Sequence, residues 1–97
     1  MTNLGSYLLI EKLLKDQRTI CVYKFIDGSV KYIWAIVNEI DANIIYQYSS
    51  CFSECITKYE DYYCCFNIFT MDEIKLMTLP EYVEVIPKDV EIIYNEG

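Results

Sequence analysis

The chain has 97 residues, with 15 acidic and 8 basic side chains, no histidine, five cysteines and ten tyrosines. A chain of this length supports one domain, because it buries only roughly 60–65% of the surface that its unfolded form exposes. The net charge of −7 argues against direct nucleic-acid binding, which requires a basic face. The absence of histidine excludes Ser-His-Asp and Cys-His catalytic sites and every His-containing zinc site.

No segment of the sequence predicts insertion into a membrane. The first twenty residues lack a basic start, and their apolar stretch ends at Glu11 and Lys12. The longest apolar run elsewhere, 33–37, is far shorter than the roughly 20 residues of a membrane-spanning helix. We therefore expect a cytoplasmic protein without a membrane partner, in which the cysteines are reduced thiols.

The cysteines do not have the spacing of a strong metal site. Cys51 and Cys55 form a C-x3-C pair, and Cys64 and Cys65 are adjacent. These four could form a zinc site or, at the adjacent pair, a redox switch, but two C-x2-C pairs are missing and free cysteine is usually buried as a small hydrophobe. The three glycines are too far apart to form a phosphate-binding loop. We expect neither a metal nor a cofactor.

Residues 3–16 have the apolar spacing of an amphipathic helix. One face combines a serine with four large aliphatic residues: Ser6, Leu9, Ile10, Leu13 and Leu14. On the opposite face, Glu11 and Lys15 are placed for an i,i+4 ion pair. Leu4 and Leu8 widen the apolar surface, which either buries the helix on two sides or contacts another chain.

Two β-rich segments, 19–26 and 30–40, are separated by an Asp-Gly-Ser turn and predict a hairpin. A two-residue Asp-Gly loop would set Lys24 opposite Lys31, which is unfavourable for like charges. We therefore expect a three-residue loop with Gly28 in the left-handed conformation. This register predicts a core face of six residues: Ile20, Val22, Val30, Tyr32, Trp34 and Ile36.

The alternation of residues 44–48 predicts a third strand, after a polar turn at 41–43. The more polar stretch 49–61 predicts a loop with room for one helical turn. Residues 62–69 return to the composition of a strand.

A capping box at Thr70 and Glu73 predicts a short helix over residues 71–77, which ends before Pro80. Residues 82–86 and 90–94 alternate apolar with acidic side chains. They are bounded by prolines, which lack the N–H that an interior strand needs, and therefore predict edge strands.

These elements together predict a single α+β domain built on an antiparallel meander, either open or closed into a small barrel. Residues 1–49 supply the N-terminal helix and three strands, whereas residues 50–97 form an acidic, tyrosine-rich half. The first half has five acidic and five basic side chains, and the second has ten acidic and three basic ones. The whole net charge therefore belongs to the second half.

Tyrosines are interleaved with these acids, and tyrosine is enriched at protein interfaces because it offers a large contact area and a polar tip. An acidic, tyrosine-rich surface attracts a basic partner through a field that salt weakens. The alternative is that the tyrosines fill a small core while the acids keep the protein soluble. The candidate partner-binding residues are Glu54, Tyr59, Glu60, Asp61, Tyr62, Tyr63, Glu81, Tyr82, Glu84 and Glu91.

The sequence therefore favours a small acidic inhibitor or decoy that binds a basic surface of a nucleic-acid-handling protein. Short acidic domains of this kind are typical of viral or phage anti-defence proteins, including the anti-CRISPR type, and of toxin-immunity proteins. We expect no enzymatic activity.

Two other classes remain open on the sequence. The first is a structural subunit or homodimer, which would use an apolar patch drawn from Leu4, Leu8, Tyr82, Val83 and Val85. The second is a cysteine-dependent enzyme, in which Lys58 or Arg18 would have to stabilise the thiolate of Cys51, Cys55, Cys64 or Cys65.

Overall fold

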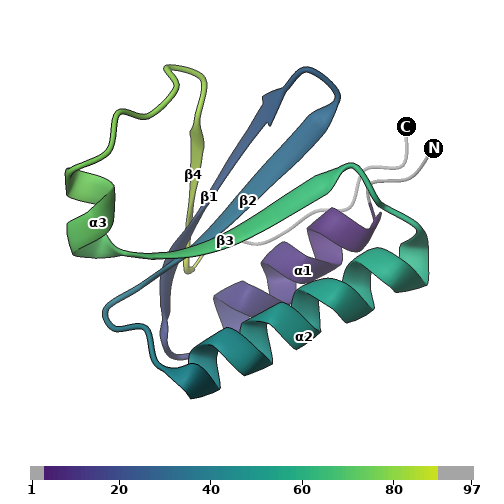
Figure 1. Cartoon of the computed structure of the whole chain (residues 1–97), viewed down its shortest axis with the longest axis horizontal. Helices are drawn as coiled ribbons and strands as arrows, with labels where there is room; N and C mark the ends of the chain where they lie inside the picture. Colours follow the sequence, from purple (N-terminus) through teal and green to yellow (C-terminus); the bar gives the residue numbers. More distant parts are fainter. Residues whose placement is uncertain (1–3, 90–97) are drawn as a thin grey trace.

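Figure 1 shows the computed structural model of the chain, which describes residues 4–89. These residues form one α+β domain in which α1 and α2 lie side by side against one face of a sheet. The elements in chain order are α1 (Leu4–Lys15), β1 (Thr19–Asp27), β2 (Val30–Val37), α2 (Ala42–Tyr59), β3 (Cys64–Thr70), α3 (Met71–Lys75) and β4 (Glu84–Pro87). The predicted fold class is confirmed.

The predicted N-terminal helix is α1. Its buried face includes every residue predicted for it, and Gly5 in addition. Glu11 and Lys15 form the expected ion pair on the outer side, with 3.3 Å between Oε1 and Nζ. Leu8 packs against the main core, so it contributes to the second buried side of the helix rather than to an exposed patch.

The largest difference from the sequence prediction is α2. Residues 44–48 are not a strand and residues 49–61 are not a loop, because most of both segments belongs to one helix, Ala42–Tyr59. Asp41 caps this helix by accepting a hydrogen bond of 2.8 Å from the N–H of Ile44. Its core-facing side chains recur at helical spacing: Ile44, Tyr48, Cys51, Phe52, Cys55 and Ile56. Within residues 4–89, no helix is both long and apolar enough to cross a membrane.

The sheet is mixed rather than an antiparallel meander. Its strand order is β3-β2-β1-β4, with β1 antiparallel to both β2 and β4, and β3 parallel to β2. The parallel pair follows from α2, which returns the chain to the end of the sheet at which β2 began. The sheet is open, and β3 and β4 form its two edges.

The hairpin between β1 and β2 has a two-residue loop rather than the predicted three-residue loop. Asp27 pairs with Val30, and Gly28 has the predicted positive φ, 64°, at the first loop position. The unfavourable pair of lysines is still avoided, because Lys24 lies opposite Ile33. The predicted core face is wrong, since Val22 pairs with Ala35 while Tyr23 pairs with Trp34 on the other face.

The last elements agree with the prediction more closely. Thr70 and Glu73 form the complete capping box that begins α3. Residues 84–87 form the edge strand β4, in place of the predicted 82–86. The predicted strand at 90–94 lies outside the described residues.

The two faces of the sheet contact different parts of the protein. The face under α1 and α2 forms the main core, with Val22, Ile33, Ala35 and Val37 at its centre. The opposite face has a smaller core, in which α3 and the segment after it cover Trp34 and Ile36. Because α3 is short, it leaves the part of this face nearest the β1–β2 hairpin less covered.

Candidate functional site

The predicted site residues fall into two segments that lie at the same end of the sheet. One segment, 54–63, ends α2 and leads into β3, whose first residue, Cys64, pairs with Lys31. The other, 81–84, leads into β4, which begins opposite Lys24. Both segments therefore meet the hairpin end of the sheet, on opposite edges, about 14 Å apart at strand spacing. Glu91 lies outside the described residues.

Most of these side chains are exposed. Tyr62, Tyr63 and Tyr82 are 63%, 66% and 60% exposed, which is unusual for large aromatic residues. The predicted glutamates within the described residues are also exposed: Glu54, Glu60, Glu81 and Glu84. Tyr59 is half-buried, and the ammonium of Lys58 lies 5.5 Å from the centre of its ring. The core-filling alternative for the tyrosines therefore does not hold at the three exposed positions.

Asp61 is the exception, because it is buried beneath α1. Its Oδ2 accepts hydrogen bonds from the backbone N–H of Ser6, at 3.0 Å, and from the Ser6 hydroxyl. Its Oδ1 forms an ion pair with the half-buried Lys31. Asp61 thus ties the first turn of α1 to the second strand, and its buried carboxylate is not exposed for binding as the sequence predicted.

Burial alone raises the pKa of Asp61, but the hydrogen bonds from Lys31 and Ser6 hold it below the usual aspartate value of 3.8. The carboxyl group therefore stays ionised inside the fold. Gly5 permits this arrangement, because a Cβ there would lie 2.9 Å from the Asp61 Cβ and from the Cys55 carbonyl oxygen. Only glycine lets α1 approach the end of α2 this closely.

A row of aromatic rings runs from the two central strands to the β4 edge, on the less covered face of the sheet. Phe25 stacks on Tyr32 with 4.8 Å between ring centres, and Tyr82 meets Phe25 at 6.3 Å. We call these three residues the aromatic strip.

Trp34 lies beside the aromatic strip. Its ring packs edge-on against Phe25 at 5.0 Å and against Phe69 at 4.8 Å. Its buried indole N–H has no hydrogen-bond acceptor among the residues that the structure describes. Such a group costs about 1–3 kcal/mol when it is left unpaired. The aromatic side of the sheet therefore contains one polar group that the described chain does not satisfy.

The exposed glutamates of the two segments are not neutralised by ion pairs within residues 4–89. The ion pairs there join Lys15 to Glu11, Arg18 to Asp16 and Lys31 to Asp61. The nearest basic neighbour by strand pairing is Lys24, which lies opposite Glu84. Within the two segments, the only basic side chain is Lys58, so acidic side chains outnumber basic ones.

Glu60 adopts an unusual backbone conformation. It ends α2 in the left-handed region, with φ 53° and ψ 37°, and its N–H bonds to the carbonyls of Ile56 and Thr57. Glycine or asparagine normally occupies this position, because a larger side chain costs about 1 kcal/mol there. Glu60 therefore presents an exposed carboxylate at a small cost in stability.

Four of the five cysteines behave as protonated thiols. Burial raises the pKa of Cys51 and of Cys64 to about 11, and it also raises the pKa of Cys21 and Cys55. Cys65 is exposed on β3. Within residues 4–89, no three acidic or cysteine side chains are grouped closely enough to hold a metal ion.

The aromatic strip was not predicted, because the expected three-residue loop placed Phe25 and Tyr32 on opposite faces. The signal was present in the period-two alternation of the two strands, but reading it needs the correct hairpin loop. A loop of two residues puts Phe25 directly opposite Tyr32.

Comparisons of the chain with protein-family models, with curated proteins and with solved structures give no match.

Proposed function

We propose that the protein is a small acidic inhibitor or decoy that acts in the cytoplasm by covering a basic surface of a nucleic-acid-handling protein. The observation that supports this most directly is the hairpin end of the sheet. There, exposed tyrosines lie beside glutamates that the described chain does not neutralise. Anti-defence proteins of viruses and phages, including the anti-CRISPR type, and toxin-immunity proteins are the classes in which such a surface is expected.

The residues of this surface suit a basic partner in two ways. Glutamates at the rim speed the approach of a positively charged protein and set its orientation. Tyr82 and the rest of the aromatic strip provide contact area that an arginine or lysine side chain can cover. Because the chain has no histidine, the surface keeps its charge across physiological pH and responds mainly to salt.

Glu60 gives separate support. Its left-handed conformation favours glycine, so a glutamate there is easier to explain by what its carboxylate binds than by the stability of α2. The cysteines also favour a binding role. A cysteine nucleophile must be a thiolate, and burial keeps the thiols of Cys51 and Cys64 protonated. A binding role is therefore favoured over a cysteine-dependent enzyme.

The test begins with capture of the partner from a host lysate on the immobilised protein, at low and at high salt. Affinity for the purified partner is then measured by titration calorimetry. We expect the double charge reversal Glu60→Lys with Glu81→Lys to weaken binding at least about tenfold, which corresponds to roughly 1.4 kcal/mol.

The matched control is Glu39→Lys, which reverses an exposed charge at the opposite end of the sheet. It should leave the affinity within about twofold of the original. Circular dichroism should show all variants folded. An affinity that neither the double reversal nor high salt reduces would contradict the proposal.

A further inference from the structure

The two edges of the sheet differ in how they are protected against pairing with another chain. Natural proteins protect edge strands with charges, prolines or short length. β4 has all three, since it spans four residues, begins at Glu84 and ends at Pro87. β3 spans seven residues with neither a charge nor a proline, from Cys64 to Thr70. Among residues 4–89, the outer edge of β3 therefore lacks the protection that β4 has.

The hydrogen bonds of β3 show which backbone groups point outward. The N–H of Lys31 donates to the carbonyl of Tyr63 at 2.9 Å, so the odd-numbered residues of β3 face β2. Because the direction of the backbone groups alternates from one residue to the next, the N–H and C=O groups of Cys64, Phe66 and Ile68 point away from β2. Thr70 follows the same alternation, but its N–H is taken by Glu73 in the capping box, at 2.9 Å.

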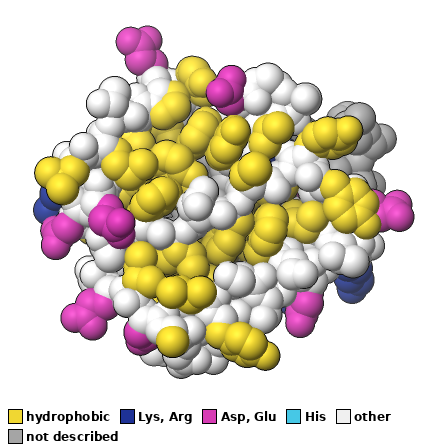
Figure 2. All heavy atoms as spheres, in the orientation of Figure 1, with side chains coloured by type: hydrophobic (Ala, Val, Ile, Leu, Met, Phe, Trp, Pro, Cys, Tyr) yellow, Lys and Arg dark blue, Asp and Glu magenta, His cyan; other side chains and the backbone are white. Residues whose placement is uncertain are grey.

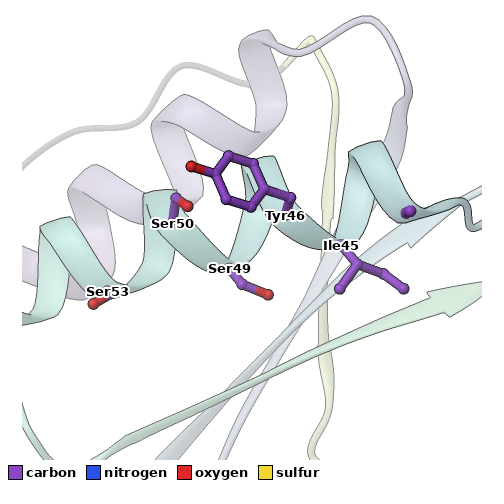
Figure 3. A pocket seen from close by; sticks show the side chains of 6 residues that line it. Ile45, Tyr46, Ser49, Ser50 and Ser53 are labelled. Carbon is purple, nitrogen blue, oxygen red and sulfur yellow. The ribbon is translucent and has the colours of Figure 1, made fainter.

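The side of α2 that continues this edge is also uncharged. No residue from Ala42 to Ser53 is acidic or basic, and Ile45 and Tyr46 are 50% and 73% exposed. The helix surface has a shallow hollow of about 530 Å³, shown in Figure 3, lined by Ala42, Ile45, Tyr46, Ser49, Ser50 and Ser53. Apart from Ile45 and Tyr46, the side chains that line the hollow are small, because three serines and an alanine complete the lining.

The edge and the helix form one face of the molecule. Phe52 of α2 stacks on Phe66 of β3 with 5.4 Å between ring centres, which fixes the helix over the strand. Figure 2, seen from the same side as Figure 1, shows hydrophobic side chains across the middle of this face and acidic ones at its rim. We call it the β3–α2 face.

We infer that the β3–α2 face binds a second copy of this chain, by antiparallel pairing of β3 with β3 about a two-fold axis at Phe66. In that register, Phe66 lies opposite Phe66 of the second copy, and Cys64 lies opposite Ile68. Every outward backbone group of these three residues then has a partner. The sheet becomes continuous across both copies, with the two α2 helices side by side on one face.

Charge favours a second copy over a basic partner on this face. Two chains that each have a net charge of −7 repel one another wherever their acidic surfaces meet. The β3–α2 face contains no charge in its strand or along most of its helix, so these parts add no repulsion between two copies. A basic protein finds no acidic side chain to pair with in β3 or in residues 42–53, whereas Glu81 and Tyr82 on the far edge stay accessible to it.

The oligomeric state is tested first, by sedimentation velocity from about 1 to 300 μM. We expect a dimer of twice 11.5 kDa in the upper part of that range. The variant Ser49→Glu places a charge on the exposed side of α2, and it should raise the dimer dissociation constant at least about tenfold. Its control, Ser29→Glu, adds the same charge at the hairpin tip and should leave dimerisation unchanged.

The register is tested by cross-linking. In the proposed dimer, Cys65 lies opposite Asn67 of the second copy in a pair without backbone hydrogen bonds, where the Cα atoms approach to about 4.5 Å and allow a disulfide. Asn67→Cys should therefore give a disulfide-linked dimer between Cys65 and position 67 under mild oxidation, as mapped by mass spectrometry. Ser29→Cys should give none.

A chain that stays monomeric throughout the concentration range overturns the inference. So does a dimer that neither Ser49→Glu weakens nor Asn67→Cys cross-links, because it must use another surface. The affinity of the partner for the Glu60 and Glu81 variants is a separate measurement, so either proposal can fail while the other stands.

Discussion

Glu60 and Asp61 are neighbours in the sequence, yet the side chain of Asp61 is buried and that of Glu60 is exposed. Asp61 turns under α1, where Ser6 and Lys31 satisfy its oxygens. Glu60 remains in solvent, in the left-handed conformation that ends α2. Two adjacent acidic residues can therefore differ in function: one forms a buried ion pair, and the other is a surface charge.

The largest expected effect on stability comes from substituting Asp61, the buried residue of the two. Asp61→Ala removes the buried carboxylate that pairs with Lys31, and with it the acceptor for the first turn of α1. We expect a loss of about 3–5 kcal/mol in the free energy of unfolding. Urea denaturation followed by tryptophan fluorescence measures it.

The matched control for this prediction is the adjacent Glu60→Ala, which should change the free energy of unfolding by less than about 0.5 kcal/mol. Equal effects of the two substitutions would show that Asp61 is not the structural member of the pair.

Acid provides a second test of the same contrast. The folded state holds the pKa of Asp61 below 3.8, and the hydrogen bonds from Arg18 lower the pKa of Asp16 to about 2. A carboxyl group with a lowered pKa in the folded state stabilises the fold above its unfolded value, and this stabilisation is lost as the pH falls through the folded value. Stability should therefore fall from about pH 4 towards pH 2.

The pH dependence is measured by repeating the denaturation of the original protein and of Asp16→Asn across that range. Asp16→Asn should lose stability less steeply, because it has one fewer group that takes up a proton on unfolding. An equally steep loss in both proteins would assign the acid sensitivity to other groups.

The smallest expected effect on stability comes from substituting Glu60, the exposed residue of the two. Glu60→Gly relieves the left-handed conformation and should stabilise the protein by about 0.5–1 kcal/mol, visible as a higher urea midpoint. If the carboxylate binds a partner, the same variant should weaken binding while it gains stability. Unchanged binding in a more stable variant would remove Glu60 from the proposed surface.

Features that depend on a few adjacent residues were predictable from the sequence. The capping box at Thr70, the positive φ of Gly28 and the buried face of α1 are all set by neighbouring residues and were confirmed. Each depends on a backbone conformation or a helical period that distant residues do not need to supply. The concentration of acids and tyrosines in the second half is likewise a property of the sequence alone.

Predicting that α2 is a helix requires a longer window of sequence. Residues 44–48 alternate in a way that favours a strand locally, but Ile44, Tyr48 and Cys55 face the core together only in a helix. Packing that helical face against α1 and the sheet outweighs the local preference. The helical period over all of α2 was the signal that a five-residue window could not show.

The tertiary structure decided what the sequence left open. Because α2 is a helix, it returns the chain to the hairpin end, and β3 becomes a parallel strand at an unprotected edge. The same return places Asp61 under α1 and leaves Glu60, Tyr62 and Tyr63 in solvent. The sequence determines how much charge the protein has and the local turns of its chain, whereas long-range packing determines which of those charges are buried and which are exposed.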